Sequence, residues 1–303
     1  MTWVTIGLSA ASLLSIAIVL TTVLNWANRK FHVDVDPRVL KVIDALPGAN
    51  CGGCGYVGCG EYAEAVVLEH EAVDRCTVGG QSCAQNIAAI MGIEIGEVLP
   101  YRPVVHCGAH YPDRLGRSEY RGEKRCAAAN MVADVQACTY GCLGFGDCVR
   151  ECRFDALHIV DGLATVDYEK CVGCGACAKV CPRNLITMTP FKAERMLAVT
   201  CSNKDKGREV MAVCRVGCIG CGACTRASEL FHLENNLSTI DYDAYPEDCT
   251  AEMLRACEKC KRHRLVFVGK PSPEDLEKAE PLEAPEVIKP DFHTTVDDTE
   301  WRG

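Results

Sequence analysis

The chain has 303 residues, a formal net charge of −9 and 23 cysteines. Its length allows one to three domains. So many cysteines would suit a small secreted disulfide protein, but this chain is long and its cysteines cluster at the short spacing of metal ligands. Metal clusters in a reducing compartment are therefore the better interpretation. The sequence shows no basic patch of the kind that nucleic acid requires, so no nucleic-acid partner is expected.

The N-terminal segment, residues 1–28, is predicted to be a transmembrane anchor. It contains no charged residue, and Val4 to Leu24 is a continuous run of apolar, small or hydroxyl residues. Such a run is long enough to cross a bilayer core of about 30 Å as a helix. Trp3 and Trp26 flank it, where interfacial aromatic residues belong.

The charges after this run predict the orientation of the anchor. Arg29 and Lys30 are the first basic residues, so the positive-inside rule places the body on the cytoplasmic side of the cytoplasmic (inner) membrane, behind a single span. A cleaved signal peptide is the alternative, but it would need a positively charged start. The anchor has no ionisable residue and offers no ligand of its own for a proton or sodium ion.

Residues 34–95 are predicted to form a small helical domain with one [4Fe-4S] cluster. Asp36-Pro37 opens a helical stretch, and the loop Cys51-Gly-Gly-Cys54-Gly-Tyr-Val-Gly-Cys59 follows it. The glycines let the loop bend tightly and turn amide groups toward the three sulfurs. Cys76, after a second helical run at 61–72, supplies the fourth thiolate. From spacing alone a zinc knuckle is the alternative.

The most specific motif lies in residues 103–192, which are predicted to form a two-cluster ferredoxin-like module. Residues 171–182 read C-x2-C-x2-C-x3-C-P. In bacterial ferredoxins the fourth cysteine of this run binds the other cluster. One cluster is therefore predicted to use Cys152, Cys171, Cys174 and Cys177. The other would use Cys142, Cys148 and Cys181. Phe145 stands where that second triplet needs a cysteine, and Cys138 is the nearest candidate for the missing ligand.

An internal repeat at an offset of 76 residues predicts a second, degenerate ferredoxin-like module at 196–269. Cys138, Cys142 and Cys148 align with Cys214, Cys218 and Cys224. The later triplet is complete, so one cluster is predicted on Cys218, Cys221, Cys224 and Cys260, with Cys257 as the alternative fourth ligand. Ser228 stands where the twin cluster needs a thiolate. The twin is expected to be lost, although one or two clusters both remain open.

The number of cysteines limits the number of clusters. Each cubane takes four thiolates, so four clusters are expected and five are the maximum. Cys83 is interpreted as a buried apolar residue in a helical segment. The sequence assigns no role to Cys107, Cys126, Cys201, Cys214, Cys249 and Cys257. The first four of these either complete altered sites, form an extra cluster or are inert.

The C-terminal segment, residues 270–303, is predicted to be a disordered tail. Ten acidic and three basic residues lie between 271 and 303, together with five prolines. Such a segment has little apolar surface to bury. The whole chain is therefore expected to be an α+β protein, with an anchor, a helical [4Fe-4S] domain, tandem ferredoxin-like modules and this tail.

These features together resemble the RnfB family, the iron–sulfur subunits of the Rnf ion-translocating electron-transport complex. The resemblance rests on the anchor, on Asn50-Cys51-Gly-Gly-Cys54-Gly-Tyr56 with Cys59 and Cys76, and on the ferredoxin modules. It covers most of residues 1–265. The N-terminal motif also resembles the iron–sulfur domain of corrinoid iron–sulfur proteins and of some hydrogenases. The order of the domains distinguishes Rnf from both, while Ser228 and the lack of a C-x2-C-x2-C run after Tyr242 depart from the family pattern.

The resemblance implies a relay of single electrons between soluble ferredoxin and a membrane complex that ends at a NADH-binding subunit and moves sodium or protons. A relay needs no catalytic residue. Gly141, Gly144 and Gly146 lie in a cysteine loop and make no dinucleotide turn, so NAD and flavin are expected on partners. The alternatives are an iron–sulfur subunit of another membrane redox assembly, either a hydrogenase or a corrinoid-linked complex, and a zinc-stapled interaction protein.

Overall fold

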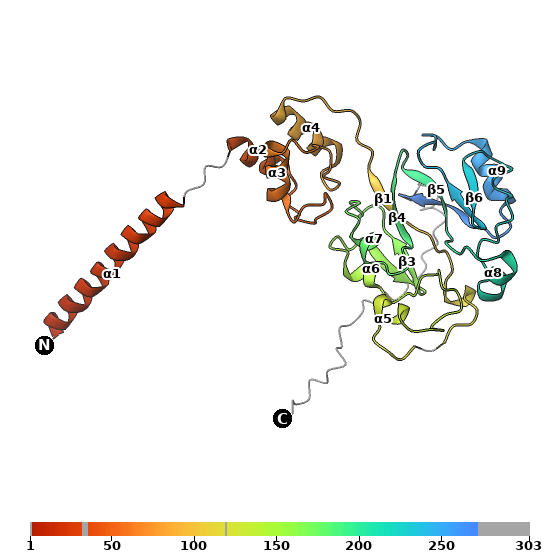
Figure 1. The fold of residues 1–303 in the computed structure, drawn as a ribbon, viewed down its shortest axis with the longest axis horizontal. Helices are drawn as coiled ribbons and strands as arrows, with labels where there is room; N and C mark the ends of the chain where they lie inside the picture. Colours follow the sequence, from red (N-terminus) through yellow and green to blue (C-terminus); the bar gives the residue numbers. More distant parts are fainter. Residues whose placement is uncertain (1, 32–35, 119, 272–303) are drawn as a thin grey trace, which may run out of the picture.

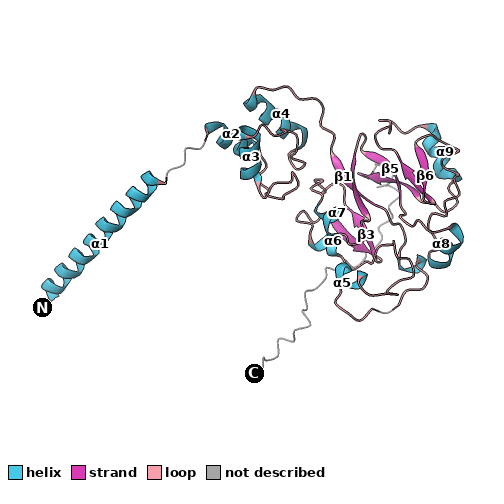
Figure 2. Cartoon of the chain, viewed as in Figure 1, coloured by secondary structure: helices cyan, strands magenta, loops and turns pink. Residues whose placement is uncertain are grey.

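The computed structural model describes residues 2–31, 36–118 and 120–271. These residues form a long N-terminal helix, a helical domain, and two modules built from short helices and two-stranded sheets (Figures 1 and 2). The mixture confirms the expected α+β class. The tail expected at 270–303 lies outside the described residues from position 272 onward.

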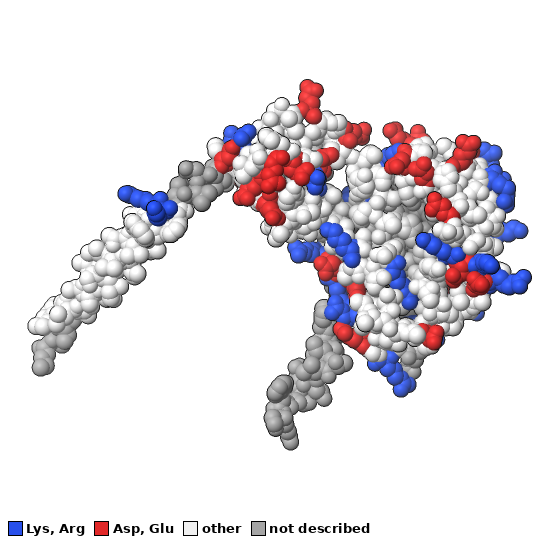
Figure 3. Space-filling view, viewed as in Figure 1, with Lys and Arg blue, Asp and Glu red and all other residues white. Residues whose placement is uncertain are grey.

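The N-terminal helix, α1 (Thr2–Lys30), stands away from the rest of the molecule (Figure 1). At 1.5 Å per residue its 29 residues span about 43 Å. It is long and apolar enough to cross a membrane, and none of it is buried inside the protein. Figure 3 shows its surface without charged side chains up to the basic end at Arg29 and Lys30.

Hydroxyl groups within α1 are compatible with a lipid environment because they bond back to the helix. The hydroxyls of Ser9, Ser12 and Ser15 each donate to the carbonyl three residues earlier, over 2.8 to 3.0 Å. Thr21 donates to the carbonyl of Ala17 over 2.7 Å. Such bonds satisfy the polar groups inside the segment itself.

The helical domain contains three helices: α2 (Pro37–Ala45), α3 (Cys59–Leu68) and α4 (Gly80–Met91). Asp36 caps α2, because its carboxylate accepts the backbone N–H of Arg38 over 2.8 Å. Val42, Val66 and Ile87, one from each helix, are fully buried and form the centre of the core. This core fixes the two ends of the cysteine loop.

The first mixed module pairs its two ends. Its strands are β1 (Tyr101–Val105), β2 (Leu157–Val160), β3 (Leu163–Val166) and β4 (Ile186–Pro190). Its short helices are η1 (Tyr111–Asp113), α5 (Cys126–Asn130), α6 (Asp147–Arg150) and α7 (Ala176–Val180). β1 pairs antiparallel with β4, and β2 with β3. This pairing brings the upstream and downstream cysteine loops together.

The second module repeats this layout. Its strands are β5 (Arg195–Val199), β6 (Phe231–Glu234), β7 (Leu237–Ile240) and β8 (Leu265–Gly269). Its helices are α8 (Gly207–Val213) and α9 (Ala251–Lys259). β5 pairs antiparallel with β8, and β6 with β7. Met196, Leu197 and Met253 are buried at the centre of its core.

The two modules are joined by backbone hydrogen bonds. Leu115 donates to the carbonyl of Val213 over 3.0 Å, and Arg215 donates to the carbonyl of Asp113 over 2.9 Å. The ring Nδ1 of His106, just after β1, lies 2.8 Å from the carbonyl oxygen of Val199 at the end of β5. The segments that follow β1 and β5 therefore face each other across the junction.

Candidate metal centres

The first cysteine cavity lies between the loop after α2 and the start of α3. It encloses about 320 Å³ and is lined by Cys51, Cys54, Cys59 and Cys76. The loop needs glycine at Gly52 and Gly55, where φ is +71° and +97°. The side-chain oxygen of Asn50 accepts the backbone N–H of Cys59 over 2.8 Å, which holds the loop against the helix.

Cys83 supports this cavity from behind. It is buried in α4, and its thiol lies 3.3 Å from the carbonyl oxygen of Ala45. A hydrogen bond from the Cys83 thiol lowers the pKa of Cys76, and a backbone N–H from Gly79 adds to this over 3.4 Å. Both bonds favour the thiolate form that a metal requires.

The second cavity is lined by Cys152, Cys171, Cys174 and Cys177 and encloses about 300 Å³. Cys152 comes from the upstream half of the first module and the other three come from the motif that ends in α7. The backbone N–H of Ala156 donates to the Cys152 sulfur over 3.4 Å. Burial raises the pKa of Cys177 to about 12, so a metal would have to displace a proton there.

The third cavity encloses about 410 Å³ and is lined by Cys126, Cys142, Cys148 and Cys181. Cys126, at the start of α5, had no role in the sequence analysis. The backbone N–H of Phe145 donates to its sulfur, so Cys126 reaches the place where the triplet lacks a cysteine. No spacing rule could have found it, because α5 lies 16 residues before Cys142 and approaches only in the folded chain.

Cys138, which the alignment nominated for this place, does not line the third cavity. It lies at the junction between the modules, where the side-chain amide of Asn203 donates to its sulfur over 3.6 Å. Burial raises the pKa of Cys138, and the nearby charge of Cys107 contributes. Phe145 blocks the alternative by packing against Tyr120, with ring centroids 5.3 Å apart.

In the second module, Cys218, Cys224, Cys257 and Cys260 pack in or against one apolar cluster, and Cys221 is exposed. The backbone N–H of Arg264 donates to the Cys260 sulfur over 3.3 Å. Leu185 makes the same bond to Cys181 over 3.4 Å. Cys260 therefore occupies the structural position of Cys181. Burial raises the pKa of Cys257 to about 11, with the charges of Cys249 and Cys260 adding to this.

The donor sets favour iron–sulfur clusters over single ions. Within the part of the chain that the structure describes, no three His, Cys, Asp or Glu side chains are arranged to hold one metal ion. A zinc site would require its sulfurs at about 2.3 Å from one point. Cavities of several hundred Å³ with four thiols around each of them instead suit a polynuclear cluster held by four cysteines.

Two segments match known families. Residues 46–78 match the family described as "Putative Fe-S cluster", and residues 164–187 match the family described as "4Fe-4S binding domain". The first segment contains the loop and Cys76 of the first cavity. The second contains three of the four cysteines of the second cavity, together with Cys181.

Three relatives cover most of the chain, and each carries the letter B among the subunits of its complex. The one from the Na(+)-translocating ferredoxin:NAD(+) oxidoreductase complex of Acetobacterium woodii is 44% identical over 72% of this chain and 66% of its own length. The one from the ion-translocating oxidoreductase complex of Methanosarcina acetivorans is 37% identical over 70% and 80%. The one from the proton-translocating ferredoxin:NAD(+) oxidoreductase complex of Clostridium ljungdahlii is 36% identical over 80% and 86%. The alignment thus spans just under two thirds of the Acetobacterium protein.

Proposed function

Because the chain belongs to the RnfB family of ion-translocating oxidoreductase complexes, we propose that it relays single electrons inside such a membrane complex. Soluble ferredoxin is the proposed partner at one end of the route and a NADH-binding subunit lies at the other. The chain itself has no substrate active site in this proposal. The family matches support iron–sulfur clusters as its cofactors.

The observation that carries the proposal is that the cysteine cavities adjoin one another. Burial raises the pKa of Cys148, and the charges of nearby cysteines add to this, including that of Cys177 from the neighbouring cavity. The N-terminal domain adjoins the first module, because the guanidinium of Arg153 donates to the carbonyl of Asn50 over 3.0 Å. Adjacent clusters are what a chain of single-electron transfers requires.

Four clusters follow from these cavities and from the second module. Their proposed ligands are Cys51, Cys54, Cys59 and Cys76; Cys152, Cys171, Cys174 and Cys177; Cys126, Cys142, Cys148 and Cys181; and Cys218, Cys221, Cys224 and Cys260. A bound cubane accepts and releases one electron without making or breaking a bond in the polypeptide. The polypeptide sets the potential by burial and by backbone N–H groups directed at sulfur, such as those of Ala156 and Leu185.

The anchor is proposed to hold the relay at the cytoplasmic face of the membrane. Helix α1 is apolar, exposed over its length and followed by Arg29 and Lys30. Exposed apolar surface of this extent needs lipid or a partner to cover it. A single span with the body on the cytoplasmic side satisfies the positive-inside rule and keeps the thiols in a reducing compartment.

The experiment that tests the relay replaces Cys174 with Ala in the assembled complex. Cys174 lies in the matched 4Fe-4S segment and lines the second cavity. Membranes with the variant should lose ferredoxin-dependent NAD⁺ reduction, while the exposed control Cys249→Ala retains it. Wild-type activity in a Cys174→Ala complex shown by EPR to lack one cubane would end the proposal.

A further inference from the structure

A fourth cavity lies at the junction of the two ferredoxin-like modules. It encloses about 430 Å³ and is lined by Cys107, Cys138, Cys201 and Cys214. Cys107, Cys201 and Cys214 are buried, and Cys138 is partly buried. This cavity is similar in size to the three described above, and like each of them it presents four thiols. Sequence spacing gives no hint of it, because its ligands come from four separate segments.

Two of the four cysteines occupy equivalent positions in the two modules. Cys107 follows β1 by two residues, and Cys201 follows β5 by two residues. The backbone N–H of Cys142 donates to the Cys107 sulfur over 3.5 Å, and that of Cys218 donates to the Cys201 sulfur over 3.3 Å. Each sulfur thus receives a hydrogen bond from the first cysteine of its own module's triplet.

The other two cysteines are also equivalent, because Cys138 and Cys214 align in the internal repeat. Arg183 donates to the carbonyl of Cys138 over 2.9 Å and to that of Gly141 over 2.7 Å. Arg262 donates to the carbonyl of Cys214 over 3.0 Å and to that of Gly217 over 3.1 Å. Both loops are therefore held by an arginine from the far end of the same module.

We propose that Cys107, Cys138, Cys201 and Cys214 bind a fifth [4Fe-4S] cluster that joins the two modules. Each module contributes one cysteine after its first strand and one from its loop. Inert cysteines would have no reason to meet in one cavity with the same hydrogen bonds on both sides. The four thiolates complete the coordination of one cubane.

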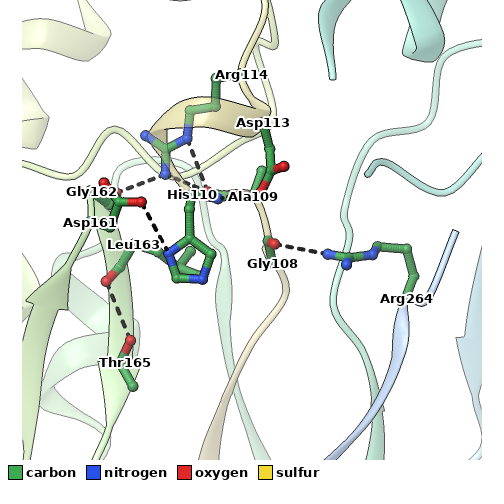
Figure 4. Close-up of polar contacts among 10 residues, drawn as sticks. All are labelled: Gly108, Ala109, His110, Asp113, Arg114, Asp161, Gly162, Leu163, Thr165 and Arg264. Atoms are coloured by element: carbon green, nitrogen blue, oxygen red, sulfur yellow. Dashed lines mark hydrogen bonds and ion pairs between the residues drawn. The ribbon is translucent and has the colours of Figure 1, made fainter. Parts of the chain in front are cut away.

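The surroundings of the cavity suit a negatively charged cluster. Arg264, from the second module, donates to the carbonyl of Gly108 over 2.9 Å, and Arg114 donates to the carbonyl of Ala109 over 2.8 Å (Figure 4). Both arginines line the cavity. The Nη1 of Arg114 is buried without a hydrogen-bond partner among the described residues. A cluster with four thiolates would give these buried cations the negative charge that they lack.

The place of this cluster defines its role, and this step rests on the proposed function. Cys142 belongs to the third cavity and Cys218 to the second module, and both touch the fourth cavity through their N–H groups. One electron would pass from a reduced cluster on one side to the joining cluster, and from there to the other side. No proton or bond changes place in either transfer, so the two modules form one continuous route.

The test is the iron content of the full chain, purified anaerobically in detergent. Cys107→Ser and Cys201→Ser lie in different modules, yet each should lose about four iron atoms and the same EPR signal, since both remove one shared cubane. The matched control Cys257→Ser should retain both. Native mass spectrometry of the unmodified chain should show five cubanes, a result that depends on no variant.

Three results would overturn the proposal: wild-type iron in both serine variants, the loss of a zinc ion instead of iron, or only four cubanes on the unmodified chain. None of these measurements involves ferredoxin or NAD⁺. A failure of the relay in membranes would therefore leave the iron counts unchanged, and a missing fifth cluster would leave the other four and the membrane assay to be judged separately.

Discussion

Gly53 lies directly against Cys174: a Cβ on Gly53 would be 3.1 Å from both the Cα and the carbonyl oxygen of Cys174. The contact joins the loop of the first cavity to the loop of the second. The bond from Arg153 to the carbonyl of Asn50 closes the same interface. The helical domain and the first ferredoxin-like module are therefore packed through the two loops that carry their proposed ligands.

A larger residue at this contact should separate the two domains without removing a cluster. Gly53→Val must displace the backbone of Cys174, and overpacking of this kind costs about 1–3 kcal/mol. We expect unchanged iron content, faster proteolysis between residues 92 and 100, and slower electron transfer from ferredoxin to NAD⁺. Gly96→Val is the control, since nothing lies within 4 Å of a Cβ there. Equal rates in the two variants would show that the interface is not part of the route.

Asp147 should determine whether Cys126 can act as a ligand. Its two carboxylate oxygens accept the backbone N–H groups of Cys126 and Ala127, each over 2.9 Å, and it pairs with Arg150. Asp147→Ala leaves those groups unsatisfied at the start of α5, at a cost of about 1–3 kcal/mol. We expect a lower free energy of unfolding and the loss of about four iron atoms.

The control for this variant is Glu123→Ala. The Glu123 side chain is exposed and pairs only loosely with Arg125, over 3.9 Å, so its removal should change stability by less than about 1 kcal/mol. If Asp147→Ala kept a full set of clusters through repeated gel filtration, Cys126 would not depend on this cap and α5 would have another support.

The sequence predicted those parts of the molecule in which chemistry follows spacing. The run from Cys171 to Pro182 and the loop from Cys51 to Cys59 bring their ligands together over a few residues, so a local pattern was enough. The match at residues 164–187 and the relatives confirm the resemblance that these motifs suggested. The offset of 76 residues also predicted a second module with paired strands.

The ligands that spacing could not reveal are those brought in by tertiary structure. Cys126 reaches its cavity only because α5 folds back over Phe145 and is held by Asp147. Cys107 and Cys201 meet because β1 and β5 end at the same junction. The nearest cysteine in sequence, Cys138, was therefore the wrong guide to the third cavity. The equivalence of Cys138 and Cys214 was visible in the repeat, but their meeting was not.

The orientation of the anchor gives a third prediction. Because Arg29 and Lys30 follow the apolar span, the positive-inside rule places the cysteine-rich body in the cytoplasm. Protease added to intact inside-out vesicles should digest the body and leave a fragment the size of α1. Right-side-out vesicles serve as the control and should protect it. Digestion only in right-side-out vesicles would reverse the proposed topology.

The second module gives the last prediction, that restoring one cysteine does not restore a twin cluster. Ser228 is buried, and its hydroxyl accepts the backbone N–H of Leu230 over 3.3 Å. In the first module, α7 and its cysteines precede β4, whereas α9 precedes β8 here. Met253 and Ala256 of α9 are fully buried in the module core. Packed side chains thus occupy the region where a second cluster would need ligands and space.

Ser228→Cys should therefore leave the iron content of the full chain unchanged, because one thiolate cannot replace the missing triplet. Met253→Ala should instead lower the free energy of unfolding by about 2–5 kcal/mol, as the loss of a fully buried side chain does. Cys260→Ser is the matched control for the surviving cluster and should remove about four iron atoms. A gain of about four iron atoms in Ser228→Cys, measured with sulfide and EPR on the same sample, would show that Cys249 and Cys257 complete a twin site and that the packing of α9 does not exclude it.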